Sequence, residues 1–178
     1  GYLAEGTRTN LCLQSEALAT TWGAALNATV GTNAATSPNG AVTADSLTDD
    51  ATNGSHYLPQ TSGAVTATAY TVSCFAKAST STYFQLALSD LTTVFYANFN
   101  LVSGVVGVKH ASATSTITAY PNGWYRCTMS FTASVGAAST IYLVCLNADT
   151  ASAGPSYVGT GLVTYAWGVQ VENAAFAS

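Results

Sequence analysis

Short runs of alternating apolar and polar residues recur along the whole chain and constrain its fold more than any other feature. The runs are rich in Thr, Val, Tyr and Phe, and Gly, Asn, Asp or Pro interrupts them. A period of two is typical of strands that bury one face. Helix signals are nearly absent, with one short candidate at 15–20. We expect strands at 9–14, 41–48, 56–61, 69–77, 83–89, 94–101, 104–109, 115–120, 124–133, 140–147 and 162–172.

The turn residues support these strand boundaries. Pro-Asn-Gly occurs at 38–40 and again at 121–123, and these residue types favour tight turns. About eleven strands without helical crossovers indicate an all-β fold, an antiparallel two-sheet β-sandwich (jelly roll). We expect a single jelly-roll domain over 1–178, excised from a longer protein. The longest irregular stretch, 148–161, is expected to be the most mobile loop.

Polarity in this chain comes from hydroxyl and amide groups rather than from charge. The sequence has four Lys and Arg, eight Asp and Glu, and a net charge of −4. Four scattered cations cannot form a phosphate-binding stripe, so we expect no nucleic acid partner. No apolar run reaches the roughly 20 residues that cross a bilayer, and 1–10 lacks the apolar core of a signal peptide. We therefore expect no membrane partner, and a surface suited to an uncharged polar ligand such as a sugar, or to no ligand.

Four short motifs follow one another along the chain: EGTRTNL at 5–11, YTVSCFAKA at 70–78, NGWYRC at 122–127 and WGVQVE at 167–172. In this order they resemble a family of domains in bacteriophage tail fibres, tailspikes and other virion proteins. Those domains are similar to carbohydrate-binding modules of the concanavalin-like or galactose-binding-like type. The resemblance implies a jelly roll with a curved sheet that can bind glycans, located in a virion or outside the cell after folding in a reducing host cytoplasm. It specifies no particular sugar.

Strand alternation predicts a ligand-binding sheet face. If 56–61, 83–89, 94–101 and 124–133 share one sheet, aromatic and amide side chains collect on its outer surface. Aromatic faces stack on the C–H patches of sugar rings, and amide and guanidinium groups bind sugar hydroxyls. In the alternative, Trp124 tucks under a loop and Arg126 pairs with a nearby Asp. The expected oligo- or polysaccharide-binding residues are Tyr57, Tyr83, Gln85, Tyr96, Asn98, Asn100, Trp124, Arg126 and Thr128.

A second candidate site is the loop rim, since loops at a sandwich edge often carry function. Its residues would be Trp22, His56, Tyr120 and Tyr157 with Asn53 and Asp149. In the alternative, Trp22 plugs one end of the sandwich. We expect no cofactor, although a structural calcium near Asp49 and Asp50 stays open because carboxylates are its preferred ligands.

The four cysteines are expected on the core faces of their strands. Cys12, Cys74, Cys127 and Cys145 have no zinc-binding spacing, so we expect free buried thiols. A Cys74–Cys145 disulfide requires that the two strands be neighbours. The same alternation directs Tyr125, Cys127, Met129 and Phe131 inward, together with Tyr165, Trp167, Val169 and Val171 of the last strand.

Catalysis has little support, because the chain has no nucleophile motif, phosphate loop or convincing carboxylate pair. We expect a carbohydrate-binding module, not an enzyme, which binds neutral glycans on a host surface as part of a phage virion or tail. Homo-oligomer or fibre assembly would supply avidity. The alternatives are a purely structural fibre or capsid decoration module and an ancillary domain of a glycan-degrading tailspike.

Overall fold

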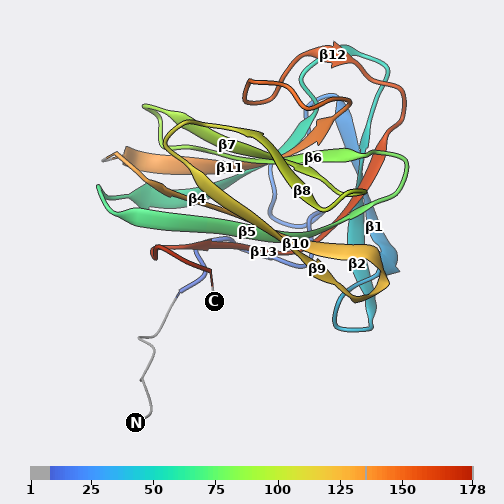
Figure 1. Ribbon diagram of the computed structural model, residues 1–178, viewed down its shortest axis with the longest axis horizontal. Coiled ribbons are helices and arrows are strands. Elements are labelled where there is room, and N and C mark those ends of the chain that lie inside the picture. Colours follow the sequence, from blue (N-terminus) through green and yellow to red (C-terminus); the bar gives the residue numbers. More distant parts are fainter. Residues whose placement is uncertain (1–8, 135, 178) are drawn as a thin grey trace.

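The computed structural model describes residues 9–134 and 136–177, and it confirms the expected all-β, two-sheet sandwich. Two antiparallel sheets pack face to face, with a small two-stranded ribbon at one end (Figure 1). The described residues contain thirteen strands and one 3₁₀ turn, at Pro121–Gly123. They include no helix long and apolar enough to cross a bilayer.

The two sheets draw their strands from distant parts of the chain. The ribbon pairs β3 (Asn53–Gly54) with β12 (Tyr157–Val158). The six-stranded sheet has the order β1 (Ala28–Thr36), β2 (Val42–Asp49), β13 (Val163–Glu172), β5 (Ala69–Ala78), β10 (Trp124–Thr132), β9 (Thr114–Tyr120). The five-stranded sheet has the order β4 (Tyr57–Val65), β11 (Gly136–Leu146), β6 (Tyr83–Ser89), β7 (Val94–Asn100), β8 (Val105–Lys109).

The inner faces of the two sheets form one continuous core. Alternation sends Cys127, Met129 and Phe131 of β10 inward, as the sequence predicts. On the facing sheet, β6 contributes Phe84 and Leu86, both fully buried. Each large apolar side chain buried in this way stabilises the fold by roughly 1.5–3 kcal/mol.

The N-terminal part of the described chain closes one edge of the sandwich rather than forming the expected strand at 9–14. Leu11 N donates to Val171 O of β13 at 2.8 Å, and Leu13 N donates to Gln60 Oε1 of β4 at 2.9 Å. Residues 15–20 form turns instead of the short helix. The segment therefore links the two sheets, and its side chain Leu18 is buried in the core.

A β-bulge reverses the faces of half of β13. The pairing of β13 with β5 breaks between Trp167 and Gln170, and Gly168 has a φ of 63°, which favours glycine. Val169 and Val171 beyond the bulge are buried, as predicted. Before the bulge Ala166 is buried instead, so the prediction that Tyr165 and Trp167 point inward is wrong.

All four cysteines are free and buried. Cys74 of β5 and Cys145 of β11 lie in opposite sheets, so they are not the strand neighbours that a disulfide would require. Cys74 instead pairs in register with Cys127. Burial raises the pKa of Cys12, Cys74 and Cys145 to about 12. These thiols are therefore protonated and unreactive at neutral pH.

The buried carboxylate of Asp90 fixes the turn between β6 and β7. Its Oδ1 accepts hydrogen bonds from Thr92 N (2.9 Å) and Thr93 N (2.7 Å). Its Oδ2 accepts from Ser134 N at 2.7 Å, which ties this turn to the end of β10. Desolvation by burial acts to raise the pKa of Asp90, but the backbone donors outweigh it and hold the pKa below its ordinary value.

Candidate functional site

The structure divides the expected platform between the two sheets. Strands β4, β6 and β7 lie in one sheet with β11 between β4 and β6, whereas β10 lies in the other sheet. Alternation assigns a face to each strand, but it does not determine which strands are neighbours. The expectation of one shared face is therefore wrong for Trp124, Arg126 and Thr128. The residues that do share the five-stranded sheet are Tyr57, Tyr83, Gln85, Tyr96, Asn98 and Asn100.

A cavity of about 240 Å³ opens on the outer face of the five-stranded sheet. We call it the tyrosine groove, because the rings of Tyr57 and Tyr142 meet there edge to face, with centroids 5.1 Å apart and planes at 84°. None of the described residues that line it carries a charge. Its lining residues are Ser55, Tyr57, Ala87, Ser89, Val94, Tyr142, Val144, Ala153 and Gly154.

Strand register explains how the groove forms. Val144 of β11 pairs with Tyr57 of β4, and Tyr142 pairs with Ala87 of β6. The small buried side chains Ala87 and Val144 form a low floor between the half-buried tyrosine rings. Tyr83 and Tyr96 pack against the same outer cluster. The result is an apolar, aromatic surface whose polar atoms are tyrosine and serine hydroxyls.

Two buried amides fix one wall of the groove. Gln85 Nε2 donates to Asn98 Oδ1 (2.7 Å) and to Ser152 O (2.9 Å), while Gln85 Oε1 accepts from Gly154 N at 2.8 Å. Asn98 Nδ2 donates to Asp149 Oδ1 and Thr150 O, both at 2.8 Å. Because both amides are fully buried and engaged in this way, they position the wall rather than face a ligand.

The other end of the 148–161 segment is held as firmly. Asp49 Oδ1 accepts from Gly161 N at 2.6 Å and its Oδ2 accepts from Tyr157 Oη at 2.8 Å. Burial and the hydrogen bond to Asp49 raise the pKa of Tyr157 well above its ordinary value. Ser55 Oγ donates to Gly154 O at 2.5 Å. Hydrogen bonds thus anchor both ends of the segment that the sequence predicts to be the most mobile loop.

The structure unites only part of the second candidate site, the loop rim. His56 and Tyr157 do meet, with ring centroids 4.5 Å apart. Trp22 Nε1 instead donates to Gln14 O, and Tyr120 packs against Phe75 of the six-stranded sheet. Asn53 of β3 pairs with Val158 of β12, so it lies at the same end as Tyr157. Asp149 lies beside Asn98.

The carboxylates considered for calcium have other roles. Both oxygens of Asp49 accept hydrogen bonds, as described above. Asp50 is 47% exposed, and its Oδ1 accepts from Thr52 N at 2.8 Å. Within 9–134 and 136–177, no three His, Cys, Asp or Glu side chains are grouped so that they could hold a metal ion.

The other expected site residues have structural contacts. Trp124 is 1% exposed and its Nε1 donates to Thr36 O at 3.0 Å, so it tucks beneath the β1–β2 hairpin. Arg126 Nη2 donates to Gln170 Oε1 at 3.2 Å. Thr128 shares a hydrogen bond with Thr116, and Asn100 Oδ1 accepts from backbone N–H groups in the turn after β7.

Tyr142 is the aromatic groove residue that the sequence analysis does not predict. It alternates with the core residues Ile141 and Leu143, so its outward direction was readable from the sequence. What was lacking was the placement of β11 between β4 and β6, which brings Tyr142 beside Tyr57. The sequence does not predict the wall residues Ala153 and Gly154, because the position of their loop depends on hydrogen bonds to distant residues such as Gln85.

The comparisons with known proteins find a structural likeness. No protein-family model and no curated protein matches this chain. TmCBM61, a protein solved in complex with β-1,4-galactotriose, superposes with a TM-score of 0.54 and 13% sequence identity. The match covers 93% of this chain and 99% of that one. At this identity the likeness shows a shared β-sandwich fold.

Three of the four sequence motifs lie side by side in the six-stranded sheet. They form β5, the start of β10 and the bulged half of β13, which are adjacent strands. The first motif, at 5–11, lies mostly outside the described residues. These three motifs therefore occupy the sheet opposite the tyrosine groove.

Proposed function

We propose that this chain is a non-catalytic module that binds a neutral oligo- or polysaccharide in the tyrosine groove. The proposal rests on one observation: the groove is uncharged, and its shape is formed without a ligand. The Tyr57 and Tyr142 rings contact each other, and a hydrogen bond to Gln85 holds the wall residue Gly154. A sugar ring presents C–H groups that pack on aromatic faces, and its hydroxyls pair with tyrosine and serine hydroxyls. The fold shared with TmCBM61, which was solved with a galactotriose, supports the same ligand class.

The size of the groove indicates weak binding at a single site. Its volume of about 240 Å³ is below the roughly 300–1,000 Å³ of sites that enclose drug-sized ligands. Little area is buried and water competes for every hydroxyl, so we expect a Kd between about 1 mM and 1 μM. Several copies on one assembly would raise the apparent affinity without new contacts.

We further propose that the module belongs to a phage virion or tail, outside the cell, and recognises host-surface glycans. What supports this context is the resemblance of four ordered motifs to phage fibre and tailspike domains. Homo-oligomer or fibre assembly would supply the required copies. We propose that binding uses no cofactor, and titration in the presence of EDTA tests that point directly, since a calcium-dependent site would lose its affinity.

A glycan array followed by titration tests the proposed function. Isothermal titration calorimetry with β-1,4-galactotriose and with each array hit should show binding. Tyr142→Ala should raise the Kd about tenfold, which corresponds to a loss of about 1.4 kcal/mol of binding free energy. Tyr142→Phe keeps the ring and should bind nearly as well, and Val42→Ala, an exposed position of β2 on the opposite sheet, should leave affinity unchanged. If no neutral glycan binds at millimolar concentration, the purely structural alternative replaces this proposal.

A further inference from the structure

The outer face of the six-stranded sheet carries a second aromatic cluster, distinct from the tyrosine groove. The rings of Phe75 and Trp167 lie 5.7 Å apart between centroids, and those of Phe75 and Tyr120 lie 4.9 Å apart at 83°. Tyr120 is 40% exposed, and the other two rings are half-buried. With Lys77 and Tyr165, which occupy the neighbouring register positions, these residues form what we call the Trp167 patch.

The bulge in β13 places Trp167 on this face. Uninterrupted alternation back from Val169 and Val171 would direct Trp167 into the core, where an indole is strongly stabilised. Gly168, with its φ of 63°, shifts the phase and turns the ring outward. Trp167 Nε1 then donates to Thr43 Oγ1 at 3.2 Å, which fixes the ring orientation. Bulges that re-aim a side chain are frequent beside functional sites.

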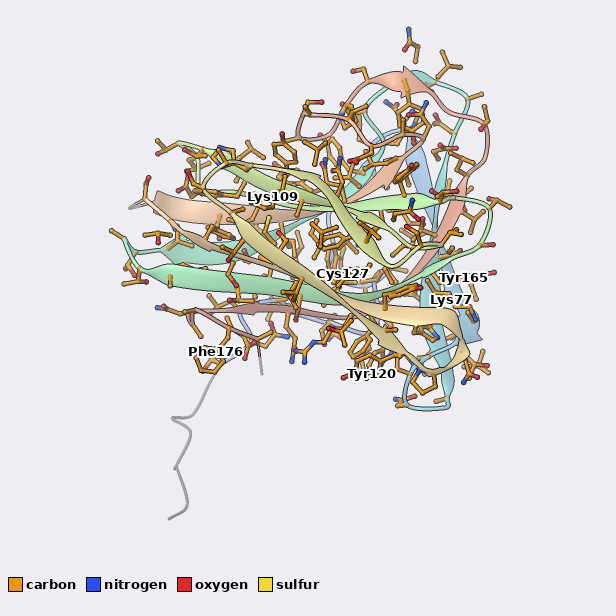
Figure 2. All side chains as sticks on the ribbon, viewed as in Figure 1. Lys77, Lys109, Tyr120, Cys127, Tyr165 and Phe176 are labelled. Carbon is orange, nitrogen blue, oxygen red and sulfur yellow. The ribbon has the colours of Figure 1, made fainter. Side chains whose placement is uncertain are left out.

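The patch is also where positive charge collects. Lys77 pairs in register with Trp124 on one side and Tyr165 on the other, so its cross-strand neighbours are aromatic. Arg126 lies over the Phe75 ring, 5.8 Å from its centroid. These are two of the four Lys and Arg in a chain of net charge −4. Figure 2 shows Lys77, Tyr120 and Tyr165 near the same end of the sheet.

We propose that the Trp167 patch is a second saccharide site and that it takes an acidic sugar, one that bears a carboxylate. The ring of such a sugar stacks on Trp167 and Tyr120, and its carboxylate pairs with the Lys77 ammonium. A charge-assisted hydrogen bond beside an aromatic surface selects for the anion. Two cations are too few for a nucleic acid, whose binding depends on many phosphate contacts. The site is independent of the tyrosine groove, which has no charged lining residue among those described.

Titration with an oligogalacturonate, followed by NMR and by calorimetry, tests this site. Lys77→Gln should weaken binding about tenfold, and raising the salt concentration should weaken binding to the unmodified protein. Lys109→Gln, which removes a cation from β8 of the other sheet, is the matched control and should have no effect. Trp167→Ala should abolish oligogalacturonate binding. If the Trp167→Ala protein does not fold, the Lys77→Gln result alone decides whether the patch binds the acidic sugar.

Three results would overturn the proposal. Absence of oligogalacturonate binding at millimolar concentration is the first, and equal losses in Lys77→Gln and Lys109→Gln are the second. The third is an oligoglutamate that binds as well as the oligogalacturonate, because the patch would then recognise charge without the sugar. Tyr142→Ala separates the two sites: it should leave oligogalacturonate binding intact while weakening the neutral glycan.

Discussion

Truncation of Gln85 to Ala should loosen the wall of the tyrosine groove. The Gln85 amide makes three hydrogen bonds, to Asn98 Oδ1, Ser152 O and Gly154 N, at 2.7–2.9 Å. Two of these hold the segment that contains the wall residues Ala153 and Gly154. Removal of the side chain therefore tests whether one buried residue preforms the binding surface.

The expected cost follows from these three bonds. A hydrogen bond of this kind contributes about 1 kcal/mol net, so Gln85→Ala should lower the free energy of unfolding by about 3 kcal/mol. If the segment stays in place instead of detaching, its unpaired groups remain partly desolvated and cost roughly 1–3 kcal/mol each. About 3 kcal/mol is therefore the lower expectation, which corresponds to a fall in Tm of roughly 6–12 °C for a chain of this size.

Urea unfolding followed by circular dichroism measures this loss. Gln14→Ala is the matched control, because Gln14 is exposed, and its free energy of unfolding should change by no more than about 0.5 kcal/mol. The same Gln85→Ala protein should bind the neutral glycan more weakly, since one wall of the groove has moved. A Gln85→Ala protein as stable as the Gln14→Ala protein would refute the reasoning that the amide holds the wall.

Three further predictions concern the fold. Asp90→Asn should cost about 2 kcal/mol in urea unfolding at neutral pH, since one of its oxygens becomes a donor facing a backbone N–H. Because folding holds the pKa of Asp90 below its ordinary value, the ionised carboxylate stabilises the fold at pH values above that ordinary pKa. This stabilisation is lost as the pH falls through the pKa of the folded state. Equal free energies of unfolding for Asp90→Asn and the unmodified protein at pH 7 would contradict this prediction. Cys12, Cys74 and Cys145, with pKa values of about 12, should react with a thiol reagent at pH 8 only after denaturant is added. Gly168→Ala should lower the free energy of unfolding by about 1–2 kcal/mol in the same urea assay, because a side chain strains a residue at positive φ. An unchanged urea midpoint would show that the bulge accepts a side chain without strain.

The fold could be predicted from the sequence because its signal is local. Period-two alternation in a run such as 83–89 gives both the strand and its buried face, and β6 occupies that range. The differences from the predicted strands have local causes too. β1 (Ala28–Thr36) is not among the expected strands, because it has few large apolar residues and lies at a sheet edge, where alternation is weak. One glycine in β13 breaks the phase, which is why Trp167 lies on the face opposite to the expected one.

The site could be predicted only in part, because it depends on which strands are neighbours. Tyr57 and Tyr96 point outward from the same sheet, as alternation indicates. The insertion of β11 between β4 and β6 is a long-range pairing that carries no local signature, and it supplies Tyr142. Alternation also cannot determine whether a loop covers a polar side chain on an outer face. Gln85 and Asn98 are expected to bind a ligand, but in the structure they bond to the loop at Ser152 and Thr150.

An NMR titration with a neutral oligosaccharide tests the central claim most directly. In the assigned spectrum of the ¹⁵N-labelled chain, β-1,4-galactotriose or an array hit should shift the amide signals of Tyr57, Tyr142 and Gly154. Signals from β5, β10 and β13 should stay in place. The opposite pattern, with shifts on those three strands and none around the tyrosine groove, would contradict the account.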